Sequence, residues 1–241
     1  ADSKGRVWIG TDKDGLYCLD VQDITLIKHF KVGCPATIMS IGEDRDGRIW
    51  VGSDGEGFGY IDAALGSYHK FPQYGNASGF SIQGTQRGDV WVGTMGQGLL
   101  RINISTNQVR AYAMKAENAP DNPSMNCITN DYISKISLSP DEKRVYVATT
   151  MGVCCLDIEQ DSWTSMFGKN CLNYGTPVRI VKEYAGKLWI GANDGLYIYD
   201  INKMQLRRYD ADPILSGNGI ASIKNDRQGR LWISTDHGLC C

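Results

Sequence analysis

Two acidic strings in the sequence have residue types that calcium loops use. Residues 12–15 read Asp-Lys-Asp-Gly, and residues 44–47 read Asp-Arg-Asp-Gly. Calcium takes about six to eight oxygen ligands, and an EF-hand loop ends on a glutamate. Neither string continues with such ligands, so we interpret both as tight turns in which the aspartate bonds its own backbone. The sequence predicts no metal site and no cofactor.

Residues 93–98, GTMGQG, have the glycine spacing of a phosphate-binding loop. No Lys-Ser/Thr pair follows them, and the next run is typical of a strand and not of a helix N-terminus. The histidines, His29, His69 and His237, are far apart in sequence, and there is no G-x-S-x-G elbow. A triad assembled from distant loops stays open, but no pattern indicates one. We therefore predict no catalytic residue in this chain.

Two segments combine aromatic and amide side chains, which carbohydrate sites commonly use. QYGNASG at 73–79 supplies Tyr74 and Asn76, and KNCLNYGT at 169–176 supplies Asn173 and Tyr174. We predict that these four residues bind a small molecule or an oligosaccharide.

The composition is that of a folded protein with no nucleic-acid partner. The chain has 241 residues, of which 42% are hydrophobic, and its net charge is −2. The chain has no excess of basic residues that would neutralise the phosphate backbone of a nucleic acid. No apolar run approaches the roughly 20 residues of a membrane helix, and the first residues do not read as a signal peptide. The eight cysteines include no CxxC pair. We expect most of them to be small buried residues, with disulfides left open.

An internal repeat organises the whole chain. Similar segments, such as GRVWIGT at 5–11 and GKLWIGA at 186–192, recur about six times. Their aromatic residues are 42, 41, 55, 43 and 43 positions apart. These residues are Trp8, Trp50, Trp91, Tyr146, Trp189 and Trp232. The repetition within an apolar strand predicts that all six are buried in equivalent places. The long interval predicts an irregular, mobile loop over 111–131.

Each repeat contains four runs of strand length separated by Gly, Asp and Asn, which is typical of a propeller blade. We predict an all-β fold, a β-propeller of four-stranded antiparallel blades without long helices, and a fragment of a seven-bladed or longer array. The blades are expected at 37–77, 78–131, 132–176 and 177–217, with partial blades at 1–36 and 218–241. Cys18, Cys155 and Cys241 occupy equivalent strand positions in different blades. We therefore expect them to lie too far apart to form disulfides with each other.

The repeat resembles a known family. GRVWIGTDKDGLYCLD at 5–20 and GKLWIGANDGLYIYD at 186–200 are similar to the two-component regulator propeller repeat. One unit, SPDEKRVYVAT at 139–149, looks more like a YVTN or WD-type repeat. The resemblance implies the periplasmic sensor region of a hybrid two-component system of the Bacteroidetes type, which detects glycan breakdown products. In the full-length receptor it implies a downstream membrane helix, a histidine kinase and a homodimer.

Lys135 and Arg179 are the remaining candidates for ligand binding. The units were aligned on an isoleucine of the first strand, which is innermost in a propeller. The preceding position then reads Ser40, Ser81, Lys135, Arg179 and Ser222. Two neighbouring cations would favour a carboxylate or sulfate on the ligand. We expect a non-catalytic, carbohydrate-sensing domain. The alternatives are a propeller enzyme such as a lyase, or a protein-interaction scaffold.

Overall fold

The chain folds into two compact units. A computed structural model describes residues 1–32, 36–62, 64–114, 128–165, 176–213, 215 and 217–241. Unit 1 is Ala1–Ala111 and unit 2 is Tyr112–Cys241. Cys34, Cys127, Cys171 and most of the predicted 111–131 loop lie outside the described residues. Within the described part, no helix is long and apolar enough to span a membrane.

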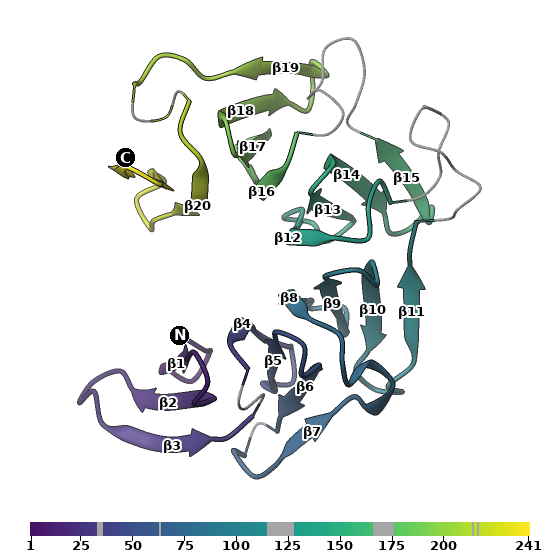
Figure 1. Cartoon of the computed structure of the whole chain (residues 1–241), viewed down its shortest axis with the longest axis vertical. Helices are drawn as coiled ribbons and strands as arrows, with labels where there is room; N and C mark the ends of the chain where they lie inside the picture. Colours follow the sequence, from purple (N-terminus) through teal and green to yellow (C-terminus); the bar gives the residue numbers. More distant parts are fainter. Residues whose placement is uncertain (33–35, 63, 115–127, 166–175, 214, 216) are drawn as a thin grey trace. The chain divides into compact units, whose positions relative to one another are not determined.

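Unit 1 contains three antiparallel sheets (Figure 1). The first consists of β1 (Arg6–Gly10), β2 (Leu16–Asp20) and β3 (Leu26–Phe30). The second consists of β4 (Ile38–Glu43), β5 (Ile49–Ser53), β6 (Phe58–Ile61) and β7 (Tyr68–Lys70), followed by a short 3-10 helix, η1 (Pro72–Tyr74). The third consists of β8 (Gly79–Gly84), β9 (Asp89–Thr94), β10 (Leu99–Asn103) and β11 (Val109–Tyr112), whose last residue begins unit 2.

Unit 2 repeats the same arrangement in three further sheets. The first consists of β12 (Ile133–Leu138), β13 (Arg144–Thr149), β14 (Gly152–Asp157) and β15 (Ser162–Ser165). The second consists of β16 (Val178–Tyr184), β17 (Lys187–Ala192), β18 (Gly195–Asp200) and β19 (Gln205–Arg208). The third consists of β20 (Ile220–Asn225), β21 (Leu231–Thr235) and β22 (Gly238–Cys240).

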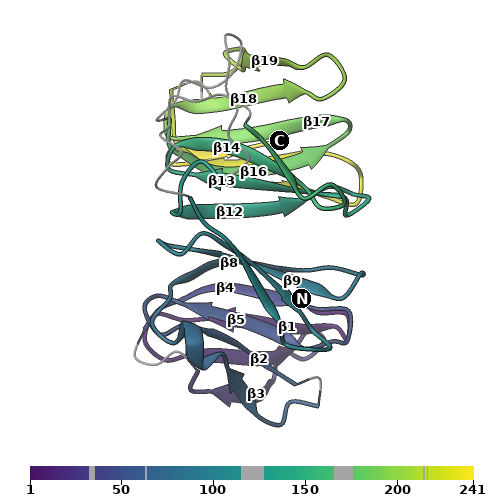
Figure 2. The same ribbon diagram turned by 90° about the vertical axis from the view of Figure 1, so that its right-hand side faces the viewer.

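Strands that follow one another in sequence are hydrogen-bonded neighbours in every sheet. In Figure 2 the strands of each unit run across the view, so their connecting turns gather at the two sides. The prediction of an all-β chain built from antiparallel propeller blades is confirmed, and η1 is the one helix in the described residues. Each blade places its first strand at one edge of the sheet and its last strand at the other.

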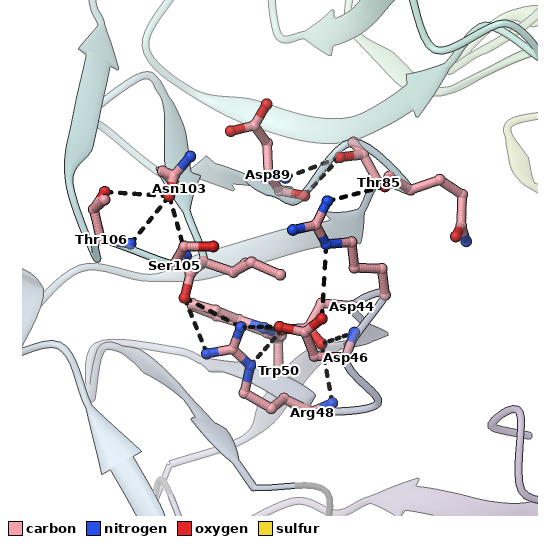
Figure 3. Close-up of polar contacts among 12 residues, drawn as sticks. Asp44, Asp46, Arg48, Trp50, Thr85, Asp89, Asn103, Ser105 and Thr106 are labelled. Atoms are coloured by element: carbon pink, nitrogen blue, oxygen red, sulfur yellow. Dashed lines mark hydrogen bonds and ion pairs between the residues drawn. The ribbon is translucent and has the colours of Figure 1, made fainter.

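The turn before β5 shows how the repeat sequence closes its first hairpin (Figure 3). Asp44 Oδ1 accepts the backbone N–H groups of Asp46 and Arg48, both at 3.0 Å. Asp44 Oδ2 accepts Arg48 Nε and Trp50 Nε1, both at 2.8 Å. Gly47 has a φ of 78°, which glycine adopts without strain. The turn role predicted for residues 44–47 is confirmed.

Cores form where neighbouring sheets pack face to face within a unit. Trp50 and Phe58 of the second sheet, with Phe71 just after it, pack against Val90, Val92 and Leu100 of the third. In unit 2, Tyr146 and Ala148 pack against Val181, Leu188 and Ile190. Each sheet thus covers an apolar face that its neighbour could not bury alone.

The predicted burial of all six repeat aromatics is wrong at three positions. Trp50, Trp91 and Tyr146 are buried, but Trp8 and Trp189 are half-buried and Trp232 is 36% exposed. Trp8 lies on β1, an edge strand with no inner strand beside it. Trp232 alternates with Ile233, and Ile233 is the residue that packs against the preceding sheet.

The cysteine prediction is confirmed for the positions that can be compared. Cys18 pairs with Trp8, and Cys155 pairs with Tyr146, so they occupy the same strand position. Cys241 directly follows β22. All three are free thiols, as are Cys154 and Cys240.

Candidate functional site

The inner edge strands β4, β8, β12, β16 and β20 all carry a one-residue bulge. In β12, Ile133 pairs with Thr149 and Lys135 pairs with Ala148, so Ser134 is the extra residue. The equivalent bulge residues are Met39, Phe80, Ser134, Arg179 and Ala221.

This register corrects the prediction that Lys135 and Arg179 occupy equivalent positions in adjacent blades. The residue equivalent to Lys135 is Ile180, which pairs with Gly191. Arg179 lies one residue earlier, at the bulge. The alignment failed because β16 contains Ile180 and Val181 side by side, and either fits the apolar pattern. A shift of one residue in a strand moves a side chain to the other face.

Arg179 joins the turns of two neighbouring blades. Its Nε donates to Asn193 Oδ1 at 2.5 Å, and its Nη1 donates to Asp236 Oδ1 at 2.9 Å. Asn193 follows β17, and Asp236 follows β21. The side chains of Arg179 and Asp236 are 41% and 48% exposed. A Cβ on Gly219 would lie 2.9 Å from Arg179 Nη1, so glycine leaves room for this contact. Arg179 is accessible, but an aspartate already pairs with its charge.

Lys135 instead lies within electrostatic reach of another lysine. Burial lowers the pKa of the half-buried Lys135 ammonium, and the positive charge of Lys224 lowers it further. Burial and the same Lys224 charge lower the pKa of Lys182. The structure therefore groups Lys135 of β12 with Lys182 of β16 and Lys224 of β20. Sequence reasoning missed the last two residues, although both follow the inner-strand bulge at the same distance.

Tyr74 and Asn76 lie close together in sequence but differ in exposure. Tyr74 ends η1, and its ring stacks on Phe58 at a centroid distance of 5.5 Å. Burial raises the pKa of the Tyr74 hydroxyl. Asn76 is exposed in the turn that follows. The Tyr74 ring is therefore partly used in core packing. Asn173 and Tyr174 lie outside the described residues.

The histidines of the outer strands make local contacts. His29 in β3 stacks on Tyr17, with ring centroids 4.2 Å apart. His69 in β7 stacks on Tyr60 at 4.9 Å. Both histidines lie on the last strand of their sheet, at its outer edge. In the part of the chain that the structure describes, no group of three His, Cys, Asp or Glu residues is arranged to hold a metal ion.

A cleft of about 540 Å³ lies between the last two sheets of unit 2. Trp189, Tyr209 and Leu231 contribute to its lining, beside the half-buried Cys240. The same aromatic residues border the apolar cluster between these sheets. The sequence had not indicated this cleft, because its walls come from strands that belong to separate repeats.

Sheets of this topology and repeat length are β-propeller blades. Residues 34–55 and 214–237 match the family model described as "Two component regulator propeller". The resemblance to the two-component regulator propeller repeat is thus confirmed at these two segments.

Solved structures of low sequence identity share this fold. The extracellular domain of the putative hybrid two component system BT4673 from B. thetaiotaomicron is 21% identical, with a TM-score of 0.79 over 99% of this chain and 30% of that one. The corresponding domain of BT3049 from the same organism is 22% identical, with a TM-score of 0.68 over 84% of this chain and 28% of that one. The chain thus spans about three tenths of the length of each. 

Virginiamycin B lyase from Staphylococcus aureus is also similar in fold. It is 16% identical, with a TM-score of 0.72 over 97% of this chain and 75% of that one. No curated protein matches the sequence significantly.

Proposed function

We propose that the chain is a non-catalytic, ligand-sensing part of a hybrid two-component receptor, located in the periplasm. The main support is the combination of its repeats with its similarity, over 99% of the chain, to the extracellular domain of a putative hybrid two component system. The ligand that we propose is an oligosaccharide. Its candidate contacts are Lys135, Arg179, Tyr74 and Asn76, together with Asn173 and Tyr174.

The two cationic candidates would act in different ways. Arg179 is exposed, and its planar guanidinium could exchange the Asp236 carboxylate for a carboxylate of the ligand. Lys135 has no carboxylate partner among the described ion pairs and would meet a ligand at the edge of β12. Both contacts favour a ligand that carries negative charge.

A thermal-shift panel of neutral, uronic and sulfated oligosaccharides tests this proposal. A ligand at 100 times its Kd stabilises a protein by about 2.7 kcal/mol. For a chain of this size, that corresponds to a rise in Tm of roughly 5–10 °C. The proposal expects such a rise with at least one saccharide class, and recovery of that saccharide unchanged by mass spectrometry. A panel without any shift would overturn it, and cleavage of the bound saccharide would favour the lyase alternative.

An exposed apolar group on the first sheet favours a second candidate, a protein-interaction surface. Val21, Ile24 and Leu26 are 49%, 77% and 57% exposed. Leu26 begins β3, which is an edge strand. Exposed apolar edges pair readily with other chains, and a second copy of this chain is the partner that the proposed receptor homodimer would supply. Light scattering of wild type and Leu26→Lys decides this: a dimer lost in the variant supports the candidate, and a monomeric wild type contradicts it.

A further inference from the structure

Three lysines of unit 2 lie on neighbouring inner strands. β12, β16 and β20 are each the edge strand of their sheet, and β16 contacts both of the others (Figure 1). Lys182 pairs with Trp189, and Lys224 pairs with Trp232, so these two occupy the same position in adjacent blades. Lys135 lies two residues before the equivalent position and hence on the same face of its strand. The repeat therefore places three ammonium groups along one edge of unit 2.

In the part of unit 2 that the structure describes, the lysines lack the carboxylate partners that other cations have. Arg179 pairs with Asp236 at 2.9 Å, and Arg230 pairs with Asp226 at 2.6 Å. Among the described residues, no ion pair includes Lys135, Lys182 or Lys224. Glu183 follows Lys182 but lies on the opposite face of β16, where burial and then Glu183 raise the pKa of the Tyr146 hydroxyl.

This arrangement has a cost that a bound anion would relieve. Like charges within reach of one another destabilise the charged forms, and Lys135 and Lys182 are also half-buried, whereas Lys224 is exposed. Burial and Lys224 together lower the pKa values of Lys135 and Lys182. An oxyanion between the strands would supply the missing acceptor, and ammonium groups on flexible stems can adapt to it.

We propose that Lys135, Lys182 and Lys224 form a binding site for sulfate or carboxylate groups carried by an acidic oligosaccharide. The saccharide part of this inference rests on the proposed sensing function, whereas the anion site rests on the lysines alone. Positions equivalent to Lys182 in unit 1 are Gly42 and Gln83, opposite Trp50 and Trp91. Unit 1 therefore lacks the equivalent cations, and the site belongs to unit 2.

Calorimetric titrations of the purified protein with three probes test the site. The probes are inorganic sulfate, a sulfated disaccharide and the same disaccharide without sulfate. The proposal expects the sulfated disaccharide to bind most tightly, with an affinity that falls as salt increases. Lys182→Gln and Lys224→Gln should each weaken that binding about ten-fold or more. Lys203→Gln is the control, because Lys203 is exposed in the turn between β18 and β19.

A stability measurement separates loss of a binding group from loss of folding. Removing one of several unpaired like charges should leave the thermal midpoint of Lys182→Gln equal to or above that of wild type. Equal binding by Lys182→Gln and Lys203→Gln, or a Lys182→Gln variant that binds weakly only because it is unfolded, would overturn the site.

The three probes also separate the two proposals. If only the neutral disaccharide binds, the lysine site fails and the sensing function stands. If inorganic sulfate binds through the lysines but no saccharide does, the anion site stands and the saccharide-sensing function fails. If nothing binds, both are overturned.

Discussion

Replacing Asp44 with alanine should lower the free energy of unfolding of unit 1 by about 3–5 kcal/mol, as when one partner of a buried ion pair is removed. The Asp44 side chain is 0% exposed, and it accepts four hydrogen bonds from the backbone, Arg48 and Trp50. Bonds to a charged group contribute about 1.5–3 kcal/mol each, and a buried donor left unpaired costs about 1–3 kcal/mol. These terms overlap, so their full sum is not expected.

Asp226 provides a matched control with the same contacts in a more open setting. It accepts the backbone N–H groups of Gln228 and Arg230 at 2.9 Å, Arg230 Nε at 2.6 Å and Trp232 Nε1 at 3.0 Å. The Arg230 side chain is 54% exposed, so water can replace the lost acceptor. Asp226→Ala should therefore destabilise the protein much less than Asp44→Ala.

Urea unfolding followed by tryptophan fluorescence measures both losses, and hydrogen exchange assigns each to its unit. An unchanged midpoint for Asp44→Ala, or equal losses for the two variants, would refute the argument that burial makes this turn important for stability.

Three further outcomes are expected. A methyl group at Gly52 would lie closest to the backbone oxygen of Gly79, which cannot rotate away as a side chain can. Gly52→Ala should therefore lower the calorimetric midpoint, and an unchanged midpoint would contradict this close approach. Burial raises the pKa of Cys155 to about 12, so at pH 8 Ellman's reagent should modify the exposed Cys241 well before Cys155, as peptide mapping can verify. Because the pKa of Lys182 lies below its unfolded value of 10.5, wild type should gain stability as pH rises through the lowered pKa towards 10.5. Lys182→Gln should gain less over that range, and identical pH profiles would contradict the like-charge contact.

The strands could be predicted from the sequence because the same local pattern recurs about six times along the chain. The Trp segments became β1, β5, β9, β17 and β21, and the Tyr146 segment became β13. The turn glycines adopt positive φ angles, as at Gly47 and Gly229. Local patterns suffice here because antiparallel neighbours in space are also neighbours in sequence.

The candidate site could be predicted only in part, because it depends on register and on contacts between repeats. The sequence alignment places Arg179 at the position of Lys135 because Ile180 and Val181 both fit the apolar position. The extra residue of the bulge therefore cannot be recognised from the sequence. No sequence pattern distinguishes Lys182 and Lys224 from the other charged residues of the strands. Their grouping follows from the packing of β16 beside both β12 and β20. Half-burial of Trp189 likewise depends on the cleft between two sheets.

The proposed sensing function requires that the protein bind an oligosaccharide without changing it. Isothermal titration calorimetry with the saccharide that gives the largest thermal shift, followed by mass spectrometry of the recovered ligand, tests it most directly. We expect saturable binding at a fixed stoichiometry and a ligand of unaltered mass. Absence of saturable heat with every saccharide class, or a recovered ligand that has been cleaved, would contradict it.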